Sequence, residues 1–244
     1  MTGTRKRRAL VTGGSGDLGS AISRALAAAG CEVIVHANSR LERAQHVVAD
    51  IASAGGQASP ACFDLTDAAA TAEAMARLLD DDAIDIIVNN AGIHDDAPMA
   101  GMSDAQWHRV IDVSLHGFFR VTRPALLPMA RLRFGRIVSV SSVAAMTGNR
   151  GQANYAAAKA ALHGATLSLA REMGSRNITA NVVAPGIIAG EMTDGLFTPE
   201  AIRQLVPAAR VGTAAEVAAV VAFLASDAAG YVNGQVIGVN GGMA

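Results

Sequence analysis

A serine, a tyrosine and a lysine have the types and spacing that carbonyl chemistry needs. Tyr155 and Lys159 lie four residues apart in the run Q-A-N-Y-A-A-A-K-A-A-L, which is rich in strong helix formers. Residues i and i+4 share one face of a helix, so the phenol and the ammonium can lie close together. A nearby ammonium favours the phenolate and lowers the phenol's pKa from about 10. Ser142, upstream after a β-rich run, is placed to hold a carbonyl oxygen beside the phenol.

Alone, such a Tyr–Lys pair is more typical of an ordinary exposed helical face. Whether it is catalytic must therefore be judged from the elements around it. Short apolar runs alternate with alanine-rich helical runs. Strands are predicted over residues 9–12, 32–37, 58–63, 85–89, 136–140, 179–183 and 235–239. Helices are predicted over 18–29, 40–54, 68–79, 104–130, 155–176 and 214–225, although Gly117, Pro124 and Pro128 argue against the later half of 104–130. The alternation predicts one α/β domain over 1–244, a doubly wound parallel sheet of about seven strands with helices on both faces.

The bulk properties exclude several classes of protein. Of the 244 residues 51% are hydrophobic but only 4% aromatic, so aliphatic side chains must fill the core. The net charge of −1 argues against a nucleic-acid binder. The basic start T-R-K-R-R precedes a strand instead of a long apolar run, which predicts a cytoplasmic protein without a membrane anchor. Cys31 and Cys62 lie in apolar, strand-like runs and are predicted to be buried thiols instead of a disulfide.

The first predicted strand runs into a glycine-rich turn that opens a helix. Gly14, Gly16 and Gly19 spell G-x-G-x-x-G, a turn whose backbone N–H groups face a pyrophosphate, although such glycines also occur for steric reasons alone. Ligands of these sheets bind at the carboxyl ends of the strands. The predicted cofactor-binding residues of the turn are Gly13, Ser15, Gly16, Asp17, Leu18 and Gly19.

The next strand ends supply further candidates. After the second strand, Asn38, Ser39 and Arg40 offer donors suited to a 2′-phosphate and no acid for a ribose hydroxyl, which favours NADP. After the third strand, Asp64 is a candidate acceptor for the adenine amine, beside Leu65. An N-terminal helix cap formed by Asp64 with Thr66 and Asp67 is an equal alternative.

The fourth strand ends in Asn89, followed by Asn90, Ala91 and Gly92. Small and amide side chains there let a cofactor lie close while they hold neighbouring backbone, although a simple turn also fits this composition.

Together with Pro185-Gly186 after the sixth strand, these motifs resemble the short-chain dehydrogenase/reductase family over essentially the whole chain. Within it the sequence is most similar to the 3-oxoacyl-[acyl-carrier-protein] reductases, through G-N-R-G-Q-A-N-Y-A-A-A-K-A-A-L, N-V-V-A-P-G-I-I, V-A-F-L-A-S-D and the terminal V-N-G-G-M. The resemblance implies a Rossmann-type fold, NADPH (with NADH as the alternative), no metal, and a homotetramer built partly on the two long helices.

Residue roles follow from the same resemblance. It implies Tyr155 as proton donor, Lys159 as its pKa-lowering partner and ribose ligand, and Ser142 as the group that polarises the ketone. It adds Asn89, Pro185, Gly186, Ile188 (through its backbone, to the carboxamide) and Thr193 to the cofactor site. Arg133 and Arg176 take the positions that receive an acidic carrier protein, although both are otherwise ordinary surface charges.

Three departures from the family pattern stand out. Ser114 takes the place of an asparagine that completes a catalytic tetrad. Asp17 takes the place of a glycine in the turn, and Gly16 that of a basic residue in NADP-preferring members. A carboxylate at 17 would face the pyrophosphate unless it turns away to cap the following helix. Gly190 replaces a threonine that bonds the carboxamide, with Thr193 as the candidate substitute.

The sequence therefore predicts NADPH-dependent reduction of a 3-oxoacyl-[acyl-carrier-protein] in fatty-acid-type synthesis. A substrate-covering segment is expected at about 190–210 (from Met192 onwards), where Leu196, Phe197, Ile202 and Leu205 favour an apolar acyl group over a sugar. One alternative is a reductase or dehydrogenase of another small ketone or alcohol, such as a 3-oxoacyl-CoA, sugar or polyol. The other, suggested by Ser114 and Asp17, is a non-catalytic nucleotide-binding or scaffold subunit.

Overall fold

A single parallel sheet runs through the molecule. The computed structural model describes residues 5–190, 193 and 195–244. Within them, seven strands pair in the order β3-β2-β1-β4-β5-β6-β7, and every pairing is parallel. This confirms the predicted fold class. The strands are β1 (Arg8–Val11), β2 (Glu32–Ala37), β3 (Gln57–Cys62), β4 (Ile86–Asn89), β5 (Gly135–Val140), β6 (Ile178–Pro185) and β7 (Val236–Val239).

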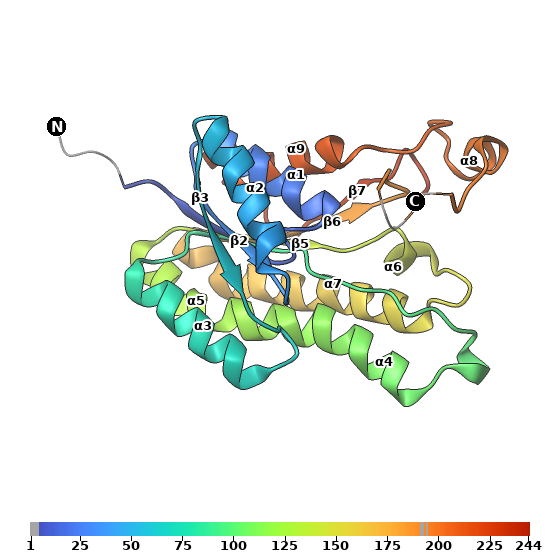
Figure 1. The fold of residues 1–244 in the computed structure, drawn as a ribbon, viewed down its shortest axis with the longest axis horizontal. Coiled ribbons are helices and arrows are strands. Elements are labelled where there is room, and N and C mark those ends of the chain that lie inside the picture. The colour runs from blue at the N-terminus through green and yellow to red at the C-terminus, as the bar shows by residue number, and fades with distance from the viewer. Residues whose placement is uncertain (1–4, 191–192, 194) are drawn as a thin grey trace.

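Helices cover both faces of the sheet (Figure 1). One layer contains α1 (Asp17–Ala28), α2 (Leu41–Ser53) and α9 (Ala214–Ala225). The other contains α3 (Ala68–Asp81), α4 (Asp104–Ile111), α5 (Gly117–Leu132) and α7 (Ala153–Met173). Two short helices, α6 (Ala144–Thr147) and α8 (Pro199–Leu205), follow β5 and β6 at the carboxyl edge.

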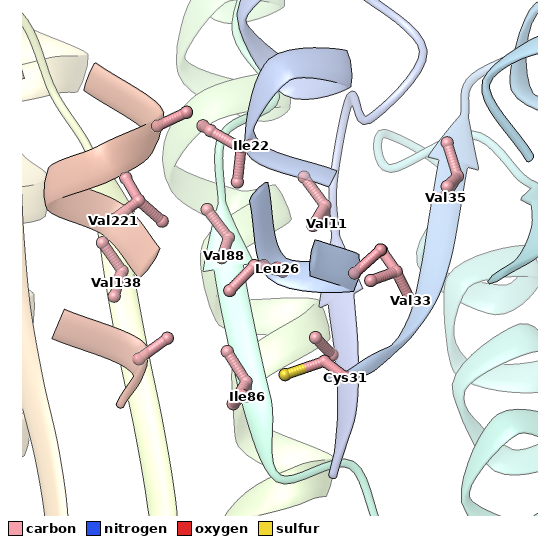
Figure 2. Packing of buried hydrophobic residues seen from close by; sticks show 14 of the residues in the cluster. Val11, Ile22, Leu26, Cys31, Val33, Val35, Ile86, Val88, Val138 and Val221 are labelled. Atoms are coloured by element: carbon pink, nitrogen blue, oxygen red, sulfur yellow. The ribbon is translucent and has the colours of Figure 1, made fainter. Parts of the chain in front are cut away.

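Alternate strand residues serve the two layers. In β1, Ala9 and Val11 pack into the core under α1 and α9, whereas Leu10 packs into the core under α5 and α7. Figure 2 shows the first of these cores, where Ile22 and Leu26 of α1 meet the strand valines. Because the inner strands β1, β4 and β5 are buried throughout, apolar residues occur at consecutive positions in them, which is the pattern that the sequence shows.

The long helix predicted over 104–130 is interrupted at one point. Residues Asp112–His116 form a π-helical turn between α4 and α5. Such a turn adds one residue to the hydrogen-bonded loop and is frequent at functional sites. Pro124 and Pro128 lie inside α5 without ending it, so the predicted helix continues through its later half despite the two prolines. The helix predicted over 155–176 begins two residues earlier, and Gly174–Arg176 form a short 3₁₀ turn.

The two cysteines differ in exposure. Both are free thiols, as expected, and Cys31 is buried. Cys62 is exposed, so its predicted burial is wrong: β3 is an edge strand, and residue 62 is at its end. Of the helices in the described ranges, none is long and apolar enough to cross a membrane.

Candidate active site

The predicted site residues gather where the strands end. The glycine turn follows β1, Asn90 follows β4, Ser142 follows β5, and the segment from Gly186 follows β6. All these strands are parallel, so their carboxyl ends share one edge of the sheet. Helix α7 starts at this edge and carries Tyr155 and Lys159 in its first two turns.

The side chains of Ser142 and Tyr155 are in contact. Their side chains form a hydrogen bond, and the Ser142 hydroxyl also accepts the Ala144 N–H at 3.1 Å. The N–H of the next residue, Val143, donates to the Pro185 carbonyl at 2.7 Å, which ties the end of β5 to the end of β6. A carbonyl oxygen beside Tyr155 would therefore meet two hydroxyl groups, which is the expected clamp and proton donor.

Burial, and not an ammonium, dominates the acidity of Tyr155. Burial raises the pKa of Tyr155 above its ordinary value, the hydrogen bond from Ser142 opposes this rise, and the Asp96 carboxylate adds to it. The expected lowering by Lys159 is therefore wrong for this arrangement. The raised pKa keeps the phenol protonated at neutral pH, as a proton donor must be.

Lys159 is a buried ammonium with a backbone partner. Only 3% of the residue is exposed, and burial lowers its pKa to about 8. Its Nζ donates to the Val140 carbonyl at 2.9 Å and lies 5.8 Å from the centroid of the Tyr155 ring. The i, i+4 prediction thus places the two groups on one face, but the ammonium points at the end of β5 instead of the phenol oxygen.

Ser114 lies beside Lys159, within the π-helical turn. A Cβ built on Gly92 would be 2.8 Å from Lys159 Nζ and 3.6 Å from Ser114 Oγ, so both side chains crowd the same face of this glycine. Only 3% of Ser114 is exposed, and its hydroxyl has no hydrogen-bond partner among the described residues. Ser114, at the asparagine position of the family pattern, therefore lies next to the buried lysine.

The glycine turn is held by side chains from neighbouring strand ends. Asn90 Nδ2 donates to the Thr12 carbonyl at 2.9 Å and to the Gly13 carbonyl at 3.2 Å. The Thr12 hydroxyl in turn accepts the N–H groups of Asn90 and Ala91. Asn89, by contrast, is buried and donates to Thr122 of α5, so its role towards the cofactor stays a prediction.

The glycines of the turn differ in how strictly they are required. A Cβ on Gly19 would lie 2.1 Å from the Gly13 carbonyl oxygen, and one on Gly14 would lie 2.9 Å from the Val11 oxygen. Gly13 has φ +61°, which favours glycine, whereas a Cβ on Gly16 would have its nearest neighbour at 3.6 Å. Sterics thus require most of these glycines, and Gly16 is the exception.

His36 is a positioning residue that the sequence did not single out. Its Nδ1 accepts the Gly13 N–H at 3.0 Å, which places the proton on Nε2, 2.8 Å from the Phe63 carbonyl oxygen. Burial lowers the pKa of His36 to about 4, so the ring is neutral. It joins the turn after β1 to the end of β3, and no local pattern in the sequence marks it.

His36 should make stability depend on pH. Between its unfolded pKa of about 6.5 and its folded value of about 4, the unfolded chain binds the extra proton. The contribution of neutral His36 to the free energy of unfolding is therefore fully present above pH 6.5 and is lost as the pH falls towards 4. We expect the free energy of unfolding to drop between pH 7 and 5 by about 2 kcal/mol more than in His36→Gln. Denaturant titrations at both pH values check this, and equal drops in the two proteins would contradict it.

The start of α1 fits a dinucleotide pyrophosphate. Its N-cap, Gly16, has no side chain and so makes no side-chain cap bond of its own. Helix N-termini with open N–H groups attract phosphate. Ser15 and Leu18 flank this point, and Leu18 is partly buried against the core.

The remaining cofactor candidates are mixed. Asn38, Ser39 and Arg40 are exposed after β2, where a 2′-phosphate could approach. Asp64 accepts both the N–H and the hydroxyl of Thr66, while Asp67 alone caps α3. The Leu65 side chain belongs to the core, and its carbonyl accepts from Arg120 at 2.7 Å.

The segment after β6 comes back against the sheet. Gly186 is close-packed, since a Cβ there would lie 2.8 Å from Asn240 Cα. Ile188 forms a parallel bridge with Gly212, and its carbonyl accepts the Thr193 hydroxyl. The Thr193 hydroxyl, which was predicted to replace the hydroxyl of a threonine at residue 190, thus already donates its proton to the protein backbone. The predicted covering segment includes α8, but Met192 lies outside the described residues.

Arg133 and Arg176 lie together, at the opposite edge of the sheet. Both are exposed, and Arg133 Nη2 donates to the Ser175 carbonyl at 3.2 Å. Arg133 and Arg176 lie two residues before β5 and β6, so both sit at the amino ends of strands. Strand β5 separates them from Ser142 by about 20 Å.

Comparisons with known proteins agree with this geometry. A family model described as enoyl-(acyl carrier protein) reductase matches residues 15–244. Nodulation protein G of Rhizobium sp. (strain N33) is 46% identical over 98% of this chain and 97% of its own length. The 3-oxoacyl-[acyl-carrier-protein] reductase of Synechocystis sp. is 43% identical over 100% of this chain and 99% of its own. The corresponding FabG of Escherichia coli (strain K12) is 44% identical over 96% of each.

A solved structure shows the same fold. A putative gluconate dehydrogenase from Agrobacterium tumefaciens superposes with a TM-score of 0.93 at 35% identity, covering 97% of this chain and 95% of that one.

Proposed function

Because this chain belongs to the short-chain dehydrogenase/reductase family and is an NAD(P)-dependent oxidoreductase, we propose that it reduces a 3-oxoacyl-[acyl-carrier-protein] with NADPH. The observation that carries the chemistry is the Ser142–Tyr155 hydrogen bond beside buried Lys159. The substrate assignment rests on the two relatives named for this reaction, each similar over nearly its whole length.

In the proposed mechanism, the ketone carbon would receive its hydride from NADPH when that cofactor is held at the glycine turn. The Ser142 hydroxyl donates to the ketone oxygen and polarises it. The Tyr155 phenol gives its proton to the same oxygen as negative charge develops there. Lys159, charged below its pKa of about 8, keeps a buried positive charge at the end of β5, on the face of α7 that carries Tyr155. Asn90, Thr12 and His36 hold the glycine turn in place for the cofactor.

The covering segment supports an acyl substrate. A hollow of about 380 Å³ opens beside it, and Phe197, Ile202 and Val211 are among its described lining residues. Leu196 and Leu205 of the same segment are 67% and 49% exposed. Exposed apolar side chains near a catalytic edge favour contact with an apolar group. A sugar would leave their surface unmatched.

The carrier-docking part of the proposal requires a second copy of the chain. Arg133 and Arg176 face away from the catalytic edge of their own sheet, so a carrier bound there would serve the site of a neighbouring copy. We therefore include the homotetramer in the proposal. Exposed Phe119 and Leu127 of α5 and Leu167 of α7 give the two long helices apolar surface for such contacts.

Charge reversal tests the docking surface. We expect Arg133→Glu/Arg176→Glu to lower kcat/KM for a 3-oxoacyl carrier about tenfold or more, because buried or steering charges at such interfaces act on encounter and affinity. The rate with the same acyl group on CoA should stay within about twofold. Arg77→Glu, at an exposed site on α3, is the matched control. Equal losses with both substrates would contradict carrier docking at these arginines.

A second candidate is oxidation or reduction of a polyol or sugar acid. The similarity to the putative gluconate dehydrogenase favours it. Activity with gluconate and NADP⁺ that exceeds carrier-linked reduction would select this candidate.

A further inference from the structure

Asp17 and Gly190 occupy one space from two distant parts of the chain. Asp17 is the first residue of α1, directly after the glycine turn, and Gly190 lies in the segment after β6. A Cβ built on Gly190 would be 2.6 Å from Asp17 Oδ2 and 3.4 Å from both Cβ and Cγ of Asp17. The aspartate side chain therefore fills the place of a side chain at residue 190.

This placement answers what the carboxylate does at the turn. It extends towards the segment after β6, with its Oδ2 at the place that a Gly190 side chain would take. The sequence required this acid to turn away from the pyrophosphate, and in the structure its side chain is directed at Gly190.

The direction of the Asp17 side chain matters for cofactor binding because α1 begins at the phosphate-binding turn. A carboxylate and a pyrophosphate both favour the positive end of a helix, so they compete for it. Two like charges this close to each other at a protein surface repel. An acid at residue 17 is compatible with dinucleotide binding only where its carboxylate points away from the place of the pyrophosphate at the start of α1.

We propose that Gly190 determines cofactor affinity by leaving room for the Asp17 carboxylate away from the phosphate-binding turn. Any side chain at residue 190 pushes the carboxylate back towards the pyrophosphate. The acid at 17 and the glycine at 190, which look like separate departures from the family pattern, are then one linked change. The inference rests on dinucleotide binding alone and is independent of the substrate.

A double-mutant cycle on cofactor affinity tests it. The dissociation constant of NADPH is measured by fluorescence titration, without substrate, for wild type, Gly190→Ala, Asp17→Gly and the double variant. We expect Gly190→Ala to weaken binding about tenfold or more, and the double variant to bind within about twofold of Asp17→Gly. Gly190 has no positive φ, so alanine needs no new backbone conformation.

Two further measurements separate charge from size and from damage to the fold. In Asp17→Asn/Gly190→Ala the crowding remains but the charge is gone, so affinity should recover to within about threefold of Asp17→Asn. Thermal unfolding of the unliganded variants should move little, and Gly101→Ala, at an open position, gives the baseline. The proposal is overturned if Gly190→Ala binds NADPH normally, if it weakens binding equally with glycine at 17, or if the asparagine variant fails to recover.

Discussion

Tyr155→Phe should lower kcat for ketone reduction about 10²- to 10⁴-fold, the usual contribution of a positioned general acid. The variant keeps the ring beside Lys159 but loses the hydroxyl that is bonded to Ser142. NADPH affinity should fall by about tenfold at most, since one hydrogen bond is removed. Steady-state rates with a 3-oxoacyl carrier and a fluorescence titration of NADPH measure the two effects.

The chain offers a matched control for this substitution. Tyr231 is the other of its two tyrosines and is fully exposed. Tyr231→Phe should retain the wild-type rate. Activity of Tyr155→Phe within about twofold of wild type would remove the phenol from the mechanism.

Gly19→Ala should have the largest effect on the cofactor site. The new methyl group would lie 2.1 Å from a backbone oxygen of Gly13 and 2.8 Å from Asn90 Nδ2, which holds the turn. The backbone must shift, so we expect a loss of about 1–3 kcal/mol in the free energy of unfolding. NADPH affinity should fall at least about a hundredfold, because the N–H groups of the turn lose their alignment. Denaturant unfolding and titration check both values.

Gly16→Ala is the control within the same turn. The nearest atom to its Cβ would be 3.6 Å away, and its φ of −84° and ψ of 173° suit alanine. Its stability should match wild type within about 0.5 kcal/mol. If Gly19→Ala were as stable as Gly16→Ala and bound NADPH normally, the turn would not be close-packed as described.

Local patterns in the sequence were enough to predict the sheet. Consecutive apolar positions in β1, β4 and β5 specify strands covered on both faces, and their bounds agree with the prediction within one residue. The turn after β1 and the i, i+4 pair on α7 also follow from spacing alone. The sequence also allowed Arg133 and Arg176 to be placed at the amino ends of the strands, since both precede predicted strands.

Other features depend on tertiary contacts that no local pattern records. The π-helical turn that buries Ser114 has no composition signal. The pKa of Tyr155 rises because neighbours bury it, and helical spacing to a lysine says nothing of that burial. His36 and the pairing of Asp17 with Gly190 join residues from distant parts of the chain. The error at Cys62 arose because an apolar strand was assumed to be central, whereas β3 is at the edge.

One kinetic comparison tests the proposed function most directly. Purified protein is given a 3-oxobutyryl carrier with NADPH or NADH, the same acyl group on CoA with NADPH, and gluconate with NADP⁺. We expect kcat/KM to be highest for the carrier with NADPH, by about tenfold or more over each of the others. A higher kcat/KM for gluconate oxidation, or no turnover of the carrier substrate, would contradict the assignment.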